Sequence, residues 1–529
     1  MRKTLLFNCL LACTCYGQAQ SSARVVYIKA GATGDGSSWE NALGDIQQGI
    51  DLATNIEGEI KKEVWVAAGK FTLSKPIVLV ENVNLYGGFN NESSVTDRIV
   101  SQSGNPWDFQ YETVLDGNNS TRILESVNFT LETVVDGFTL TRGNGEKGSQ
   151  LKAGMGGAAV VRNNVILQNS IVSHNACSDN GGAICMTGGK IKDCLFANNK
   201  GGTGGAVYMN IGDKEISHVE GCIFENNASI IKGGALNVQG KGTAYLNALI
   251  IRNNQAIDGT ILKAGGAVNI NAPTVFLSNS VIYNNSGLNS VYLNGGELLN
   301  TTIVNNIGGV YSASTSAHTR IINNVIWGCE SSDKATGLTG ASNTACIIKN
   351  NATFGSIAAN KGYVLADNIE LSSNKTNGDV LNPAEGTVGS GAKFNTVTSF
   401  IGVATTGEQL DELLLADWSI KETSPLIDRG LNIDEITNDI QGSVRNNRYD
   451  IGAYEFRDHS TTLDTKLSSV LKVIVAGKQI QLLNTLGMIE VYDMMGRLVL
   501  KSENPVFHLS QSGYYIIRNR QRSIKISVQ

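Results

Sequence analysis

The sequence predicts an all-β chain whose main part is a parallel β-helix, a coil in which each turn of short strands stacks on the turn before it. Three observations support this prediction. A Gly-Gly-apolar step recurs along the chain, beginning at Gly156, Gly181, Gly204, Gly233 and Gly265. Each interval between these steps contains an apolar residue followed three positions later by Asn. The runs between these motifs are short, rich in β-branched residues and bounded by Gly or Asn, which is typical of β-strands.

A repeat with a period of roughly 20 to 30 residues, without a helical pattern between its strands, is typical of a β-solenoid. Neighbouring turns would lie at the spacing of paired strands, about 4.8 Å, and would bury their inward side chains by stacking. Gly-Gly provides the backbone freedom for sharp corners. Asn tolerates left-handed conformations, so asparagines at one place in successive turns are expected to stack and share side-chain hydrogen bonds. The predicted stack consists of Asn175, Asn199, Asn227, Asn254, Asn285 and Asn306.

These motifs resemble two known groups of proteins. The stretches 181–184, 196–199 and 224–227 resemble the Gly-Gly-Ala-Ile and Phe-x-x-Asn motifs of the chlamydial-type polymorphic outer membrane protein repeat. The stretches 64–69 and 84–89 are similar to the N-terminal coils of secreted bacterial right-handed β-helix proteins, which have a pectin lyase-like solenoid fold. The resemblance implies that the coil is right-handed.

The first residues have the pattern of a secretory signal peptide. Met1-Arg2-Lys3 is basic, an apolar run follows, and Gly17-Gln18-Ala19 has small residues at the positions that a signal peptidase recognises. Cleavage after Ala19 predicts a signal peptide over residues 1–19. Leu10-Leu11-Ala12-Cys13 also has the form of a lipoprotein cleavage box, so acylation of Cys13 is the alternative.

Residues 20–60 are expected to form an N-terminal strand and a capping helix. Val25-Val26-Tyr27-Ile28 has the composition of a strand. From Asn41 to Ala53, apolar residues recur at helical spacing. An amphipathic helix at this place would cover the first turn of the solenoid, which otherwise exposes apolar side chains and unpaired strand edges.

Two similar segments precede the main repeat. Thr113-Val114-Leu115-Asp116-Gly117 recurs farther along the chain as Thr133-Val134-Val135-Asp136-Gly137. The offset between the two segments is expected to be one turn of the coil, so Asp116 and Asp136 are expected to stack about 4.8 Å apart and could hold Ca²⁺ between their carboxylates. Asp-Gly is also a common turn pair, which is the alternative interpretation. Calcium apart, no cofactor is expected.

Six cysteines remain after the predicted signal peptide. Export permits disulfides, and Cys194 and Cys222 hold the same place in consecutive repeats, within bonding distance of each other. The preferred interpretation is that the two stack as small apolar side chains. No Cys-x-x-Cys pair occurs for metal or redox chemistry.

The repeat loosens between Ile307 and Phe400, where long loops are expected to leave the coil, and residues 323–328 form its last clear corner. Next come four elements: Leu415 to Ile420, Ser424 to Gly430, Asp439-Ile440-Gln441-Gly442 with Arg445, and Asp450-Ile451-Gly452-Ala453-Tyr454-Glu455. These motifs resemble the choice-of-anchor Q domain proteins, extracellular β-helix proteins whose C-terminal attachment module varies. The predicted β-helix therefore covers residues 61–456.

The charged residues of this motif could be taken for a catalytic carboxylate set. We prefer a structural role, because they lie where the solenoid is predicted to close and Arg-carboxylate bonds can satisfy exposed strand ends. The set consists of Asp428, Arg429, Arg445, Asp450 and Glu455.

Residues 457–469 are polar and irregular and are predicted to form a linker. Residues 470–529 have alternating strand patterns around turns. Their Tyr492 to Arg497 and Gly513-Tyr514-Tyr515 elements resemble the C-terminal sorting domain of type IX secretion substrates, a small β-sandwich, although the Asn-Pro that often opens such domains is missing. The resemblance implies contact with the secretion machinery and a secreted or outer-membrane surface protein of a Gram-negative bacterium.

Composition excludes some partners. The net charge is −5, charged residues make up 17% of the chain, and no Lys/Arg run occurs, so no nucleic-acid partner is expected. No run of 18 apolar residues follows the signal, so no membrane-spanning segment is expected. We expect a monomer.

Two classes of function fit the sequence. The preferred one is a noncatalytic adhesin or glycan-binding scaffold, whose partner is a polysaccharide or a glycan of a host or cell surface. The alternative is a polysaccharide lyase or glycoside hydrolase acting on acidic polysaccharides, since many right-handed β-helices cut such polymers. A hydrolase needs paired carboxylates, and a lyase needs a base and a cation. The polygalacturonase-like signatures Asp-Asp, Gly-His-Gly and Arg-Ile-Lys do not occur, and each histidine lies alone in the sequence, so no catalytic residue is predicted.

Overall fold

The computed structural model describes most of the chain from Arg24 onward. The described residues are 24–56, 61–90, 98–101, 103–145, 154–313, 319–330, 337–340, 346–354, 357, 364–371, 379–382, 387–446 and 448–457, followed by 472–476, 479–483, 489–493, 497–502, 504, 506–509, 513–519 and 522–528. The predicted signal peptide, Cys13 and all but the first residue of the predicted linker lie outside these residues.

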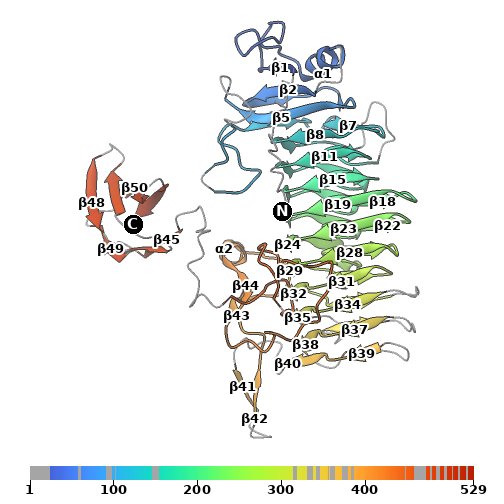
Figure 1. Ribbon diagram of the computed structural model, residues 1–529, viewed down its shortest axis with the longest axis vertical. Coiled ribbons are helices and arrows are strands. Elements are labelled where there is room, and N and C mark those ends of the chain that lie inside the picture. Colours follow the sequence, from blue (N-terminus) through green and yellow to red (C-terminus); the bar gives the residue numbers. More distant parts are fainter. Residues whose placement is uncertain are drawn as a thin grey trace, which may run out of the picture.

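The strands between Arg24 and Leu371 form a right-handed parallel β-helix (Figure 1). Successive turns pair in parallel, and crossovers between parallel strands of one sheet are right-handed in nearly all proteins. Three long sheets, named A, B and C, and a short sheet D form the faces of the coil. One turn in the middle of the coil passes through β11 (Val165–Gln168) in sheet A, β12 (Ile171–Ser173) in B, β13 (Ala176–Asn180) in D and β14 (Ile184–Met186) in C.

Sheet A begins at the N-terminal end of the coil and runs its whole length. Its strands in spatial order are β1 (Arg24–Ile28), β2 (Lys62–Ala67), β5 (Val83–Phe89), β8 (Thr133–Asp136), β11, β15 (Gly189–Lys192), β19 (Ile216–Glu220), β23 (Thr243–Asn247), β28 (Val275–Ser278), β31 (Glu297–Leu299), β34 (Arg320–Ile322), β37 (Ile347–Lys349) and β39 (Val364–Ala366).

Sheet B follows sheet A in each turn after a short corner. Its strands are β3 (Gly69–Thr72), β6 (Thr113–Asp116), β9 (Thr139–Thr141), β12, β16 (Leu195–Ala197), β20 (Ile223–Glu225), β24 (Ile250–Arg252), β29 (Val281–Tyr283), β32 (Thr302–Val304), β35 (Val325–Trp327), β38 (Ala352–Phe354) and β40 (Ile369–Leu371).

Sheets D and C complete the turn. Sheet D contains β13, β17 (Lys200–Thr203), β21 (Ala228–Lys232), β25 (Gln255–Asp258) and the antiparallel β26 (Ile261–Leu262). Sheet C contains β4 (Ile77–Val78), β7 (Leu124–Glu125), β10 (Ala159–Val161), β14, β18 (Val207–Ile211), β22 (Leu236–Gly240), β27 (Val268–Asn271), β30 (Val291–Leu293), β33 (Val310–Ser312) and β36 (Leu338–Gly340).

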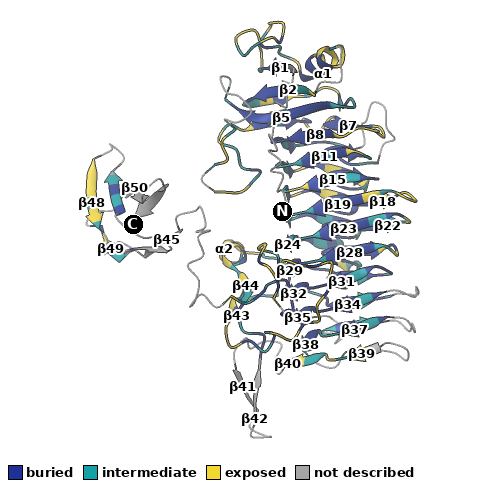
Figure 2. Ribbon diagram, viewed as in Figure 1, coloured by how far each residue is buried: buried dark blue, intermediate teal, exposed yellow. Residues whose placement is uncertain are grey.

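The core lies inside the coil, where each turn adds similar side chains to those of its neighbours (Figure 2). Val219, Leu246 and Leu277 pair in successive strands of sheet A and are fully buried. Phe196 and Phe224 do the same in sheet B, and their rings stack at 4.8 Å. Because each layer covers the next, apolar burial grows with the number of turns.

The predicted asparagine stack is confirmed. Asn199 donates from its backbone N and from Nδ2 to Oδ1 of Asn227, both at 3.0 Å, and Asn227 bonds to Asn254 in the same way at 2.9 Å. The same pair of bonds joins the remaining members of the predicted stack. Each of these asparagines follows a residue with positive φ, such as Asn198 at 58° and Asn226 at 58°.

A second asparagine stack, which the sequence did not predict, lies at the corner between sheets A and B. Asn324 Nδ2 donates to Oδ1 of Asn351, and Asn351 Nδ2 donates to Oδ1 of Asn368, at 2.9 and 3.1 Å. The coil therefore continues in register beyond the corner at 323–328, where the repeat was expected to loosen, and its last strand ends at Leu371.

Helix α1 (Ile46–Thr54) lies in the stretch where the sequence predicts a capping helix. Asp45 caps it, with its side chain accepting from the backbone N of Gln48 at 2.9 Å. Ile50 and Ala53 are fully buried and belong to the core of the coil. The helix lies at the N-terminal end of the stack (Figure 1).

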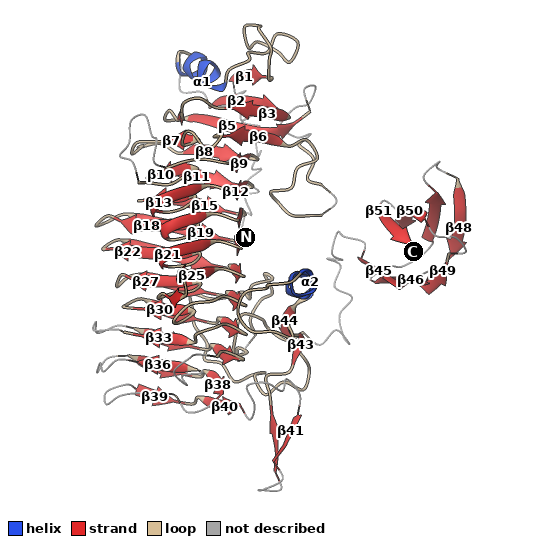
Figure 3. Cartoon of the chain, turned by 180° about the vertical axis from the view of Figure 1, so that it is seen from behind, coloured by secondary structure: helices blue, strands red, loops and turns tan. Residues whose placement is uncertain are grey.

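The predicted extent of the coil, 61–456, is too long. After the last coil strand come the hairpin of β41 (Asp379–Asn382) and β42 (Thr387–Ser390) and then the segment 391–457, which we call the strap. The strap contains β43 (Phe394–Thr396), α2 (Gly407–Leu415) and β44 (Asp417–Ile420). It lies beside sheet B rather than over the end of the coil (Figures 1 and 3).

Packing of the strap explains why the outer face of sheet B is apolar in the later turns. The outward side chains of Val304 and Trp327 share a buried cluster with Phe394, Trp418 and Leu426 of the strap. Neither α1 nor α2 is long and apolar enough to cross a bilayer, and no other helix occurs among the described residues.

The C-terminal region forms two antiparallel sheets. One contains β45 (Lys472–Ala476), β46 (Gln479–Leu483) and β49 (Val506–His508), and the other contains β48 (Leu498–Ser502), β47 (Ile489–Asp493), β50 (Gly513–Asn519) and β51 (Arg522–Val528). Ile480 and Phe507 of the first sheet and Val491 and Ile517 of the second belong to one buried cluster. This cluster is separate from the core of the coil.

Candidate functional site

Asp116 and Asp136 do not stack, so the geometry on which a calcium site was predicted is wrong. Asp116 lies in β6 of sheet B and is paired with Thr141 of the next turn. Asp136 lies in β8 of sheet A and is paired with Gln168 of the next turn. The repeated segment occupies two different faces of the coil, because the offset between its two copies is shorter than one turn.

Each of the two carboxylates is instead bound by cations. Asp116 lies 2.6 Å from Nζ of Lys70 and also pairs with Arg142. Burial opposes ionisation of Asp116, but hydrogen bonds from Arg142 and Lys70 lower its pKa to about 2. Asp136 pairs with Arg98 at 2.5 Å. Both aspartates therefore take part in structural ion pairs. In the described parts of the chain, no group of three or more His, Cys, Asp or Glu side chains is placed to hold a metal ion.

The motif at 428–455 contains a buried arginine with a structural role. Nη1 of Arg445 donates to Oε2 of Glu455 at 3.1 Å, and Nη2 donates to the Gly452 and Ala453 carbonyls. Nη2 also donates at 3.0 Å to Oδ1 of Asn279, a corner residue of the coil. Arg445 thus fastens the strap to the coil, which agrees with the structural interpretation of the motif but places it beside the coil.

Asp450 organises the backbone of the same motif. Its carboxylate accepts from the backbone N–H groups of Asp428 and Phe456, at 2.7 and 2.5 Å. Its own N–H donates to Oε2 of Glu455 at 3.1 Å. Both carboxyl groups are almost fully buried, and burial raises the pKa of each. These carboxylates hold loops together by accepting backbone hydrogen bonds.

The raised pKa of Asp450 predicts that the stability of the folded chain depends on pH. Burial raises its pKa from 3.8 to about 6, so between these values the folded chain binds more protons than the unfolded chain. Its contribution to the free energy of unfolding is full below pH 3.8 and is lost as the pH rises through 6. The stability of the natural protein minus that of Asp450→Asn, from denaturant titrations, should therefore be about 2 to 3 kcal/mol larger at pH 4 than at pH 7. A difference that does not vary with pH would contradict this.

A pocket of about 580 Å³ lies where the strap meets the last turns of the coil. The sequence did not single out this site, and only Arg429 of the predicted set belongs to it. Its lining residues are Asn350, Asp367, Asn368, Ile369, Arg429, Gly430, Leu431, Asn432 and Arg448. Arg429, Asp367 and Arg448 are exposed. The volume is in the range that small-molecule and saccharide-sized ligands occupy.

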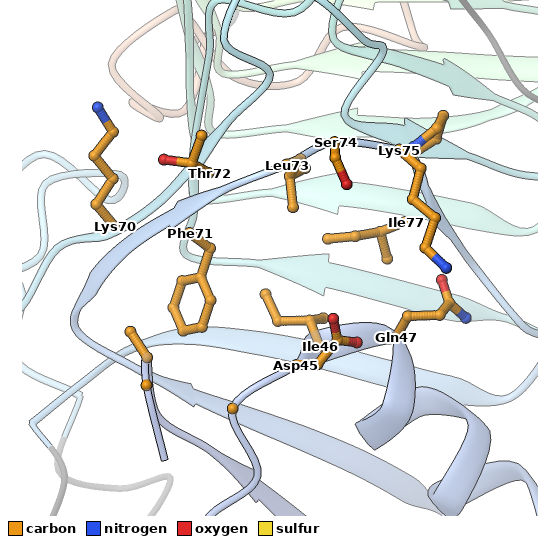
Figure 4. A pocket seen from close by; sticks show the side chains of 14 residues that line it. Asp45, Ile46, Gln47, Lys70, Phe71, Thr72, Leu73, Ser74, Lys75 and Ile77 are labelled. Carbon is orange, nitrogen blue, oxygen red and sulfur yellow. The ribbon is translucent and has the colours of Figure 1, made fainter. Parts of the chain in front are cut away.

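A second pocket, of about 260 Å³, lies between α1 and the first turn (Figure 4). Phe71, Ile46 and Ile77 are apolar residues among its lining. The side chain of Lys70 points away from the other labelled side chains of the pocket (Figure 4). Its Nζ lies 2.6 Å from Oδ2 of Asp116. The pocket is small and lies at the contact between the capping helix and the coil.

One row of aromatic side chains lies on the outer face of sheet A. His218, Tyr245 and Phe276 pair in register and stack at ring-centroid distances of 5.1 Å. His218 is therefore not isolated as the sequence suggested, and burial lowers its pKa. Because each ring covers the face of the next, the rings present mainly their edges to solvent. The stack joins neighbouring turns.

The six cysteines that the structure describes, including Cys194 and Cys222, are buried, and no disulfide joins any two of them. These two occupy the corner before β16 and β20, which pair in register. Each thiol donates to a backbone carbonyl at 3.2 Å, and burial raises the pKa of Cys194 far above its ordinary value. The structure shows the pair as stacked thiols.

The strand register and the closed core define the class of protein, a right-handed parallel β-helix protein with a strap and a C-terminal pair of sheets. No protein-family model and no curated protein matches the sequence. Among solved structures, the crystal structure of pectate lyase Pel9A is similar, with 12% sequence identity and a TM-score of 0.45. The similarity covers 83% of this chain and 97% of the pectate lyase chain.

Proposed function

We propose that this chain is a noncatalytic glycan-binding scaffold that is exported to the surface or the medium of a Gram-negative bacterium. The observation that supports a binding role most directly is the pocket between strap and coil, which has saccharide size and a polar lining with two exposed arginines. Its walls come from a rigid coil and from a strap fastened to that coil, so the site is held in place before a ligand arrives.

The use of the motif carboxylates favours binding over catalysis. Asp450 and Glu455 are buried and accept hydrogen bonds from backbone N–H groups and from Arg445. A glycosidase needs two carboxyl groups that face the scissile bond in one groove. These two face the interior of the strap.

The alternative function is a polysaccharide lyase or glycoside hydrolase acting on acidic polysaccharides. Incubation of the purified mature protein with a panel of acidic and neutral polysaccharides distinguishes the two, provided that both binding and new chain ends are measured. The proposal expects binding without new ends. Reducing or unsaturated ends that increase with time, and that heat-denatured protein does not produce, would establish the enzyme instead.

The proposed route of export is type IX secretion, with the C-terminal region as the sorting domain. The motifs that resemble such domains support this proposal, as does the separate buried cluster of the C-terminal sheets. Because that cluster shares no residue with the core of the coil, its removal should leave the coil folded.

Truncation after Ser469, in a host with type IX secretion, is therefore expected to leave folded β-helix in the periplasm. Immunoblots of periplasm, membrane and medium, with protease resistance as the test of folding, measure this. Replacing residues 461–468 by Gly and Ser, with the C-terminal region kept, is the control and should export normally. Export of the truncated protein at full-length levels would refute the sorting role and favour an anchor at Cys13.

A further inference from the structure

We propose that the pocket between the strap and the last turns binds a carboxylate-bearing sugar unit, with Arg429 and Arg448 as the residues that recognise the carboxylate. This inference rests on the proposed glycan-binding function and names the ligand class and the residues responsible. The two arginines lie 19 positions apart in the strap, and both line the same pocket.

The backbone that carries Arg429 is fixed by the coil. Nδ2 of Asn350 donates to the carbonyl oxygen of Arg429 at 2.9 Å. The backbone N of Leu431 donates to Oδ1 of Asn323 at 2.8 Å, and Nδ2 of Asn323 donates back to the Leu431 carbonyl at 2.7 Å. Asn323 and Asn350 are corner residues with φ of 60° and 53°, so the stacked corners of the coil set the position of this loop.

The backbone next to Arg448 is joined to the same loop. The N–H of Gly430 donates to the carbonyl oxygen of Tyr449 at 2.6 Å. The N–H of Asp428 donates to the carboxylate of Asp450 at 2.7 Å. These bonds bring the residues after Arg429 and after Arg448 side by side, so the two guanidinium groups are carried on adjoining, fastened segments.

The two guanidinium groups differ in their partners from several other arginines of the coil and strap. Arg98, Arg142, Arg252 and Arg320 each pair with a carboxylate, and buried Arg445 pairs with Glu455. Neither pocket arginine forms an ion pair within 4 Å with any residue that the structure describes. Both are exposed. Exposed guanidinium groups without a carboxylate partner are suited to a carboxylate ligand, which they bind through paired N–H donors.

The rest of the lining suits a sugar ring. Asp367 is an exposed corner residue with φ of 53° whose carboxylate can accept hydrogen bonds from hydroxyl groups. Ile369 and Leu431 add apolar surface for the C–H groups of a pyranose ring. Two cationic groups against one carboxylate give the lining a net positive charge, so a uronic acid unit is favoured over a neutral sugar.

Binding of polygalacturonate and of trigalacturonate to the full mature protein tests the proposal, with neutral galactan and dextran sulfate as comparison polymers. R429Q and R448Q are each expected to weaken binding of trigalacturonate about tenfold or more, and the double variant to abolish it, with unchanged thermal unfolding. Lys421→Gln removes one exposed positive charge from the strap outside the pocket and should bind as the natural protein does.

The outcomes separate the two proposals. If R429Q and R448Q both bind trigalacturonate as tightly as Lys421→Gln and the natural protein do, the pocket assignment is wrong. If the natural protein binds dextran sulfate or galactan as tightly as polygalacturonate, the carboxylate specificity is wrong. Both results leave a glycan-binding function in place. Failure of the natural protein to bind any polysaccharide of the wider panel would instead overturn the proposed function itself.

Discussion

Gly234→Val and Gly205→Val are each expected to lower the free energy of unfolding by about 4 kcal/mol or more, or to prevent folding. A Cβ at Gly234 would overlap the carbonyl oxygen of Gly266 in the next turn, and a Cβ at Gly205 would overlap that of Gly234. Both obstacles are backbone atoms, so no side-chain rotation can remove them. The turns would have to separate, which would break the parallel pairing on either side.

Thermal or denaturant unfolding followed by circular dichroism measures this effect. Gly407→Val is the matched control, because a Cβ at the start of α2 would have no atom of another segment within 4 Å, and Gly407 has no positive φ in the left-handed region. The control should unfold close to the natural protein. Unfolding of Gly234→Val at the temperature of the control would show that the turns are not in close contact at this corner.

The two glycines of each repeated step have different physical roles, which the sequence could not separate. The first glycine has positive φ, as in Gly204 at 70° and Gly233 at 68°. The second, as in Gly205 and Gly234, has no such φ and is required by the close approach of the next turn. The repeat predicted the corner, but the reason for the second glycine depends on a contact across turns.

The sequence also could not predict the strap. Short strands such as Val281–Tyr283 and Val325–Trp327 are apolar at every position, so alternation does not show which side chains face inward. Only the folded chain shows that Val325 and Trp327 face outward and are covered by the strap. For the same reason, the motif at 428–455 was predicted to close the end of the coil and instead lies along its side.

Offsets between repeated motifs predicted register only where the turns have similar length. Pairing joins Asn199 to Asn227 and Asn227 to Asn254, so the asparagine stack could be predicted. In the first turns Tyr86 pairs with Asp136, 50 positions away, because a long loop leaves the coil. The much shorter offset between Asp116 and Asp136 therefore does not correspond to a turn. Arg448 carries no motif signal at all, since its place in the pocket depends on the path of the strap.

The asparagine stack provides the second large expected effect. Asn227→Ala is expected to cost about 3 kcal/mol or more of unfolding free energy. Oδ1 of Asn227 accepts from the backbone N and from Nδ2 of Asn199, and Nδ2 donates to the carbonyl oxygen of Phe196 and to Oδ1 of Asn254. Asn227 is fully buried, so water cannot replace these bonds. The variant would leave the N–H of Asn199 without its acceptor in the interior.

Two further variants show whether the loss is one of hydrogen bonds or of packing. Asn227→Asp keeps the volume and the acceptor oxygens but replaces two donors by a buried charge, so it should also destabilise the coil at pH 7. Asn210→Ala removes an exposed amide on sheet C and should change stability by less than about 0.5 kcal/mol. Chemical denaturation of the three variants at pH 7 makes the comparison. If Asn227→Asp were as stable as the natural protein while Asn227→Ala was not, filled volume rather than the hydrogen-bond ladder would hold the turns in register.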